Sequence, residues 1–157
     1  MDIVALSTSV VWVDFITIVL SKIFNFGRSM DLWYKRFGIV AVLSDCLVII
    51  LGILLTQFIF PNASLIHFIV FAVCIQLIHD FLFFVLVIKK VPLGDNSIID
   101  LFKQYSEENS YKILIADSTM VASSIILYTL LKRMYSNQVS FLGLLGAYAL
   151  TYIIYTK

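Results

Sequence analysis

Five apolar runs divide this chain, and four of them are long and apolar enough to cross a lipid bilayer as helices. A spanning helix needs about 20 mostly apolar residues, because about 30 Å of hydrocarbon is crossed at about 1.5 Å per residue. The runs that meet this requirement well are 37–60, 65–88, 113–131 and 139–155. The fifth run, 3–20, is more polar, so a helix lying at the membrane surface is the alternative for it. We therefore expect an all-α, integral membrane helical bundle with four to five transmembrane helices.

The composition supports this class of protein. The chain is 61% hydrophobic and 13% charged, with a mean hydropathy of +1.00. Soluble domains are about half apolar and about a quarter charged, and one of this size would be unable to bury so much apolar surface. The net charge of +1 gives no basis for binding nucleic acid. Residues 1–157 are expected to form a single transmembrane domain surrounded by the lipid bilayer.

The polar segments between the runs differ greatly in length. Residues 61–64 form a short turn containing Pro61, so the helices on either side are expected to form a hairpin. The linker 89–112 is the longest polar stretch, and its apolar residues recur at helical spacing: Ile98, Leu101, Phe102 and Tyr105. This pattern predicts an amphipathic helix over 96–109, lying at the membrane surface or docked on a partner.

Basic residues are divided unequally between the two ends of the expected helices. If all five runs span, nine basic residues share one face: Lys22, Arg28, Lys35, Arg36, Lys89, Lys90, Lys103, Lys112 and Lys157. The other face receives Lys132 and Arg133. Lys and Arg accumulate on the cytoplasmic side of short loops, so the N-terminus is expected at the lumen or exterior and the C-terminus in the cytoplasm. Trp33 and Tyr34 fit an interfacial anchor on the cytoplasmic face.

Each of the first four runs contains an aspartate, and these residues are Asp14, Asp45, Asp80 and Asp117. A charged residue at the centre of a span costs about 2.5–3.5 kcal/mol, so the four side chains are expected to point into the bundle. Counted from the ends of the runs, all four lie roughly 6–12 Å below the cytoplasmic edge. The sequence therefore predicts an intramembrane polar cluster of these aspartates and His79, the neighbour of Asp80.

Two interpretations of this cluster remain open. In the functional one, the cluster binds a cation, relays protons or recognises a polar head group. In the structural one, neutral aspartates hydrogen-bond between helices and fix how the helices pack. No cofactor is expected, and the sequence does not determine whether a metal binds. Small residues at spacings typical of close helix packing complete the candidate set: Gly38, Gly52, Gly143 and Ala147.

Three short elements of the chain are distinctive: Ile78-His79-Asp80, Pro92-Leu93-Gly94 (followed by 99–105) and Ala116-Asp117-Ser118; the segment 44–52 accompanies them. In these elements, and from about Leu32 to the C-terminus, the chain resembles an uncharacterised multi-pass membrane protein family of nucleocytoplasmic large DNA viruses, the giant viruses. Such proteins commonly have Gly-Asp-Ser where this chain has Ala116-Asp117-Ser118, and the resemblance leaves Asp14 uncovered. It implies a setting, the lipid membrane beneath an icosahedral capsid, and no catalytic residues.

These observations lead to three functional hypotheses. The first is a structural protein of a virion's internal membrane, whose cytoplasmic loops 24–36 and 89–112 contact capsid proteins, other virion membrane proteins or further copies of the chain. The second is a small ion or proton transporter, or a channel-forming protein, that uses the aspartate and histidine cluster. The third is a lipid-modifying membrane enzyme whose carboxylates hold a divalent metal. The sequence contains no GxSxG, HExxH or P-loop motif, which favours a structural role.

Overall fold

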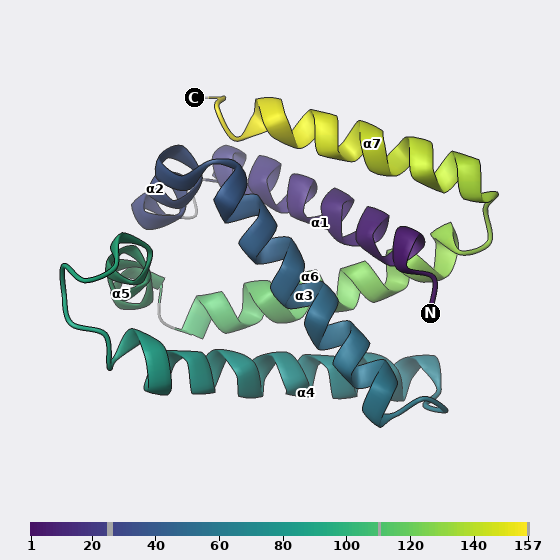
Figure 1. Cartoon of the computed structure of the whole chain (residues 1–157), viewed down its shortest axis with the longest axis horizontal. Coiled ribbons are helices and arrows are strands. Elements are labelled where there is room, and N and C mark those ends of the chain that lie inside the picture. The colour runs from purple at the N-terminus through teal and green to yellow at the C-terminus, as the bar shows by residue number, and fades with distance from the viewer. Residues whose placement is uncertain (25–26, 110, 157) are drawn as a thin grey trace.

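The computed structural model describes residues 1–24, 27–109 and 111–156, and within these ranges the chain is helical without any strand (Figure 1). The helices in chain order are α1 (Ile3–Phe24), α2 (Arg28–Phe37), α3 (Ile39–Ile59), α4 (Leu65–Phe83), η1 (Phe84–Ile88), α5 (Ser97–Asn109), α6 (Tyr111–Leu131) and α7 (Ser136–Ile153). The prediction of an all-α bundle is confirmed. Lys157, one of the nine basic residues assigned to one face, lies outside the described residues.

Four helices are long and apolar enough to cross a membrane. They are α1, α3, the continuous helix formed by α4 and η1 (Leu65–Ile88), and α6. The most polar expected span, 3–20, is thus among the four, as α1. The expected span 139–155 corresponds to α7, which is not among them; α7 is 18 residues long and begins with Ser136, Asn137 and Gln138.

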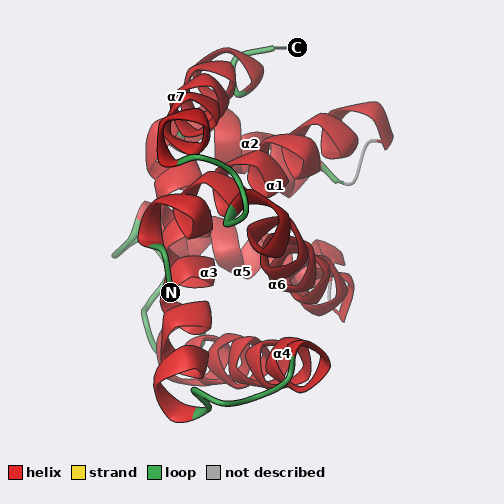
Figure 2. Ribbon diagram, turned by 90° about the vertical axis from the view of Figure 1, so that its right-hand side faces the viewer, coloured by secondary structure: helices red, strands yellow, loops and turns green. Residues whose placement is uncertain are grey.

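The long helices alternate in direction. In Figure 1, α1, α4 and α7 run towards the end of the bundle that holds α2 and α5, whereas α3 and α6 run away from it. The two chain ends therefore lie at opposite ends of the bundle. Figure 2 looks along these helices and shows α7 on one side and α4 on the other, with α1 and α6 between them. Helix α3 crosses the bundle obliquely and meets α4 at the turn formed by residues 61–64.

Helix α1 is the most enclosed of the four, which explains its polar composition. It packs against α3, α6 and α7, and Leu6, Val10 and Ile18 are fully buried in the core. Three of its hydroxyl groups bond to its own backbone, as Ser9 Oγ does to the Leu6 carbonyl at 2.7 Å, and Thr8 bonds to the Val139 carbonyl of α7. A hydroxyl group is tolerated in this buried position because a backbone carbonyl of the preceding turn accepts its hydrogen bond. Because α1 lies inside the bundle, it does not match the alternative of a helix lying at the membrane surface for 3–20.

The apolar surface that remains exposed is large and regularly placed. On α3, the large exposed side chains recur every three or four residues: Leu43, Leu47, Leu51, Leu55 and Phe58. This spacing gives one continuous stripe along the helix, opposite the face that contacts α1 and α4. Such a stripe would be unfavourable in water but suits the hydrocarbon of a bilayer.

Helix α2 is the main element that the sequence reasoning missed, because residues 24–36 were expected to form a loop. Its apolar residues, Met30, Trp33, Tyr34 and Phe37, are spaced as on one helix face. The helix ends at Gly38, whose φ of +53° is a conformation that favours glycine. A Cβ on Gly38 would also lie 2.9 Å from the Tyr155 hydroxyl. Gly38 thus separates α2 from α3 and makes a close contact with the C-terminal segment.

The packing of α7 on α1 corrects one expectation. A Cβ on Gly143 would lie 2.7 Å from Thr8 Oγ1, and one on Gly146 would lie 2.9 Å from Val11 Cγ1. Ala147, selected from the spacing of small residues, is exposed, and Gly146 takes the buried place. Positions three and four residues after Gly143 both lie near its face of the helix, so the period alone does not separate them, and the contact with Val11 of α1 selects Gly146. Gly52, by contrast, would place a Cβ at an ordinary 3.6 Å from Gln76 Oε1.

Candidate functional site

The most polar part of the bundle interior surrounds Asp45 of α3. One carboxylate oxygen, Oδ2, accepts hydrogen bonds from the Trp33 indole N–H and from the Tyr34 hydroxyl, both at 3.0 Å. Both donors come from α2 and both are buried. Neighbouring aromatic residues of a short helix thus bind one carboxylate of a spanning helix, and they fix α2 against the end of the bundle.

Asp14 of α1 lies beside this group and is completely buried. Its Oδ2 receives the Cys46 thiol at 3.8 Å, a weak contact, and its Oδ1 has no hydrogen-bond partner. Asp14 and Asp45 are close enough for their charges to repel each other. A carboxyl group with an unsatisfied oxygen in such surroundings is uncommon, because a buried polar atom without a partner costs free energy.

The remaining predicted site residues lie on α4 and α6. The Asp80 Oδ1 atom accepts a hydrogen bond from the Gln76 amide at 2.7 Å and lies 3.1 Å from His79 Nδ1. The His79 side chain is 48% exposed and stacks on the ring of Phe83. Asp117 makes no hydrogen bond within the described part of the chain, but it lies close enough to both Asp80 and Asp45 for electrostatic repulsion. The four aspartates therefore form one electrostatically connected series, Asp14, Asp45, Asp117 and Asp80.

Helix α5 adds residues that the sequence reasoning did not place in this site. Asn96 caps the start of α5 by accepting hydrogen bonds from the amides of Ile98 and Ile99. Nine residues further on, Tyr105 lies near the aspartates: burial, followed by the nearby charges of Asp117 and Asp45, raises the pKa of its phenol. Tyr105 therefore remains a neutral hydrogen-bond donor at physiological pH.

Tyr34 is held in the same state. Burial, followed by the charges of Asp45 and Asp14, raises its pKa well above the usual value. A neutral Tyr34 is required for the observed geometry, since its O–H group donates to Asp45. The sequence places Trp33 and Tyr34 next to the basic pair at the membrane edge. The helical spacing of apolar residues over 30–37 is the signal that could have predicted that both face the bundle interior and Asp45.

Helices α2 and α5 are joined to each other above this cluster. Glu108 of α5 accepts hydrogen bonds from the backbone N–H groups of Arg28 and Ser29, both at 2.8 Å. A carboxylate at the first turn of α2 also interacts favourably with the helix dipole. These hydrogen bonds lower the pKa of Glu108 below its ordinary value. On the inner side, the ring of Trp33 packs against Phe102 with 4.8 Å between centroids. We call the paired helices α2 and α5 the end platform.

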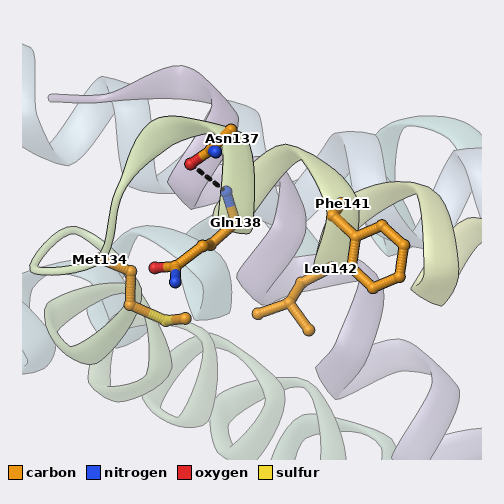
Figure 3. Close-up of a pocket in the computed structure, with 5 residues that line it drawn as sticks. All are labelled: Met134, Asn137, Gln138, Phe141 and Leu142. Carbon is orange, nitrogen blue, oxygen red and sulfur yellow. Dashed lines mark hydrogen bonds between the residues drawn. The ribbon is translucent and has the colours of Figure 1, made fainter.

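Two pockets lie between helices of the described chain. One is a shallow apolar recess at the α6–α7 turn, at the opposite end from the end platform, where Gln138 and Leu142 face Met134 (Figure 3). Asn137 and Phe141 complete its lining. The second, about 490 Å³ in volume, is a groove between α4 and α6 lined by apolar and hydroxyl side chains, Ser118 and Thr119 among them. Neither is lined by a member of the aspartate series.

The geometry also bears on metal binding. Across residues 1–24, 27–109 and 111–156, no group of three or more His, Cys, Asp or Glu side chains converges on a point where a metal ion would be held. The aspartates are near enough to interact through their charges, yet they do not form a coordination shell. The third hypothesis, a metal-dependent enzyme, gains no support from this arrangement.

An all-helical bundle with four helices able to cross a membrane, enclosing polar residues and exposing apolar ones, is the architecture of a multi-pass membrane protein. Comparison with known proteins finds no matching family model, no matching curated protein and no matching solved structure. The function must therefore be inferred from the geometry of the chain itself.

Proposed function

We propose that this chain is a structural multi-pass membrane protein whose end platform binds partner proteins at one face of the membrane. The observation that supports this most directly is the attachment of α2 to α5 through Glu108, Arg28 and Ser29. A short amphipathic helix with a free end would be mobile, whereas two helices joined to each other and to Asp45 present a fixed surface. A fixed surface loses little conformational entropy when a partner binds.

The outer side of the end platform has the polar character of an exposed binding surface. Asp31, Lys35 and Arg36 of α2 and Gln104 and Glu107 of α5 are all exposed. Mixed charges of this kind suit recognition of a folded protein by complementary charges more than insertion into lipid. The partner class that follows is a protein at the membrane surface.

We further propose the internal membrane of a virion as the setting, with capsid proteins, other virion membrane proteins or further copies of this chain as the partners. This part rests on the resemblance of 44–52, 78–80, 92–94 and 116–118 to the giant-virus membrane protein family. A host endomembrane is the expected location before the particle is assembled.

The proposed orientation places the end platform in the cytoplasm and the N-terminus at the lumen or exterior. Its support is the position of the basic residues, since Lys22 ends α1 and the pair Lys35 and Arg36 ends α2. Lys89 and Lys90 directly follow η1 at the same end of the bundle. Proteins of this class keep such residues in the cytoplasm.

Transport by the aspartate cluster is the alternative, and its support is the close approach of the four aspartates. None of the four aspartates lines either of the two described pockets. The hydrogen bonds from Trp33 and Tyr34 instead give Asp45 a role in holding α2 in place. This contact favours packing over passage of an ion.

The experiment that tests the structural proposal is incorporation into purified particles. Membrane-containing virions from cells that express the tagged chain are separated on a density gradient and compared with the membranes of the same cells. The chain is expected in the particles at a fixed ratio to the capsid protein. Its absence from particles, together with its presence in cell membranes, would contradict the proposal.

A matched pair of variants locates the binding surface. Gln104→Arg with Glu107→Arg changes the outer side of α5 and adds basic residues to the face that is already basic, so the topology signal is kept. The control, Lys132→Gln, removes a charge at the opposite end of the bundle and also keeps that signal. Incorporation is expected to fall severalfold for the first variant and to remain unchanged for the second. Equal incorporation of both would contradict a role for the end platform.

A further inference from the structure

We propose that Asp14, Asp45 and Asp117 form a buried proton-binding site, which exchanges protons with the face of the membrane that holds the end platform and does not conduct them across. This inference goes beyond the structural role proposed above. It would hold equally for a scaffold protein and for an enzyme, because it concerns what the interior of the bundle binds.

The first observation is the unsatisfied oxygen of Asp14. The side chain is completely buried, its Oδ1 has no partner, and its Oδ2 meets only the Cys46 thiol at 3.8 Å. An ionised carboxylate in apolar surroundings is strongly unfavourable unless it is paired with a cation or fully hydrogen-bonded. A bound proton removes the charge and supplies a donor, so a proton is the ligand that this position lacks.

The second observation is the identity of the groups that face the cluster. Four side chains from other helices face Asp45 of α3: Asp14 of α1, Tyr34 of α2, Tyr105 of α5 and Asp117 of α6. Asp117 also faces Asp80 on α4. Within the described part of the chain, His79 is the one basic side chain that contacts any of the four aspartates, and it is bonded to Asp80.

Two lysines at this end of the bundle bond to backbone carbonyls rather than to an aspartate. Lys22 donates to the backbone carbonyl of Thr156, and Lys103 donates to that of Val91. The ion pair found among the described residues is that of His79 with Asp80, so Asp14, Asp45 and Asp117 have no lysine or arginine partner there. Since a converging set of metal ligands is also not found across the described residues, protons rather than metal ions fit the site.

Protons are expected to enter the cluster from one side, because its surroundings differ between the two directions along the bundle. Towards the end platform, Tyr105 lies within electrostatic range of Asp45, of Asp117 and of the exposed Glu108. In the other direction along α1, Val10 and Leu6 are fully buried and apolar, and the buried hydroxyls of Thr8 and Ser9 are bonded to backbone carbonyls. We therefore place proton exchange on the Tyr105 side, since the far half of α1 offers no titratable group next to Asp14.

The test is infrared spectroscopy of the full chain in lipid nanodiscs. Wild type is expected to show the C=O band of protonated carboxylic acids at neutral pH, with a shift in heavy water. Asp14→Asn and Asp117→Asn should each remove a distinct part of this band. The control Asp95→Asn, in an exposed loop, should leave it unchanged. The absence of the band in wild type, or a band that neither variant alters, would overturn the proposal.

Two measurements keep the test decisive. If Asp14→Asn does not fold, Asp117→Asn decides the outcome. Asp117 makes no hydrogen bond within the described residues, so this substitution should leave the fold intact. Proton flux is then followed in liposomes containing a pH-sensitive dye. No sustained flux is expected in wild type. A sustained flux that Asp45→Asn abolishes would overturn the one-sided site and show conduction instead.

Discussion

Trp33 donates its indole N–H to the carboxylate of Asp45 at 3.0 Å, and this bond fastens a short surface helix to a membrane-spanning one. The same oxygen accepts the hydroxyl of Tyr34. A carboxylate that would be costly alone in the membrane thus has two donors, both supplied by α2. The contact connects the polar interior of the bundle with the proposed binding surface above it.

Removing one donor should loosen α2 without disturbing the core. Tyr34→Phe keeps the ring and deletes only the hydroxyl, so we expect a loss of about 1–2 kcal/mol in the free energy of unfolding. Thermal unfolding in detergent, followed by circular dichroism, measures it. The control Tyr111→Phe changes an exposed tyrosine at the start of α6 and should have almost no effect. Equal stability of both variants would show that the Tyr34 bond contributes nothing.

The junction between α2 and α5 should depend on pH through Glu108. Hydrogen bonds to Ser29 and Arg28 lower the pKa of Glu108 in the folded protein. The stability it contributes is therefore complete above its ordinary pKa of 4.5 and is lost as the pH falls through the lower, folded value. At neutral pH the junction is closed, and it should open only in acid.

The fluorescence of Trp33 reports this opening in a Trp12→Phe background, since the chain has two tryptophans. Wild-type Glu108 should give an acid transition below pH 4.5, the ordinary pKa of the group. Glu108→Gln should show the altered signal already at neutral pH, because an amide cannot accept two charge-assisted hydrogen bonds. Glu107→Gln, an exposed neighbour, should behave as wild type. A transition that persists in Glu108→Gln would assign it to another group.

The corrected face of α7 can be tested with small substitutions. Gly146→Ala places a Cβ 2.9 Å from Val11 Cγ1, so the helices must separate slightly. We expect a loss of about 1–3 kcal/mol, the usual cost of overpacking a core. Ala147→Val adds more volume on the exposed side and should cost much less. Thermal unfolding of the two variants in the same detergent decides, and a larger loss for Ala147→Val would restore the original interpretation.

The orientation of the chain can be tested with single cysteines. In a Cys46→Ser, Cys74→Ser background, Gln104→Cys and Thr156→Cys should be labelled by a membrane-impermeant maleimide from the cytoplasmic side. Asn62→Cys should be labelled from the other side. The result for Thr156→Cys also determines whether α7 crosses the membrane, because labelling from the same side as Asn62→Cys would mean that it does not.

The positions of the helices could largely be read from the sequence. Runs of about 20 apolar residues gave α1, α3, α4 with η1, and α6, and the period of Ile98, Leu101, Phe102 and Tyr105 gave α5. Both signals are local, because hydropathy and helical period depend only on neighbouring residues. The sequence also placed an aspartate in each of four runs at similar depth, and alternation of helix direction brings such residues level.

Which residues touch was decided by the tertiary structure. Inside a bilayer, the lipid-facing and packed sides of a helix are both apolar, so hydropathy could not separate Gly146 from Ala147. Nor could it show that Trp33 and Tyr34 turn towards Asp45, or that Tyr105 lies near Asp117, since both depend on how separate helices pack against each other. The aspartates themselves were local features of the sequence; the unsatisfied oxygen of Asp14 and the two donors of Asp45 exist only because five helices meet around them.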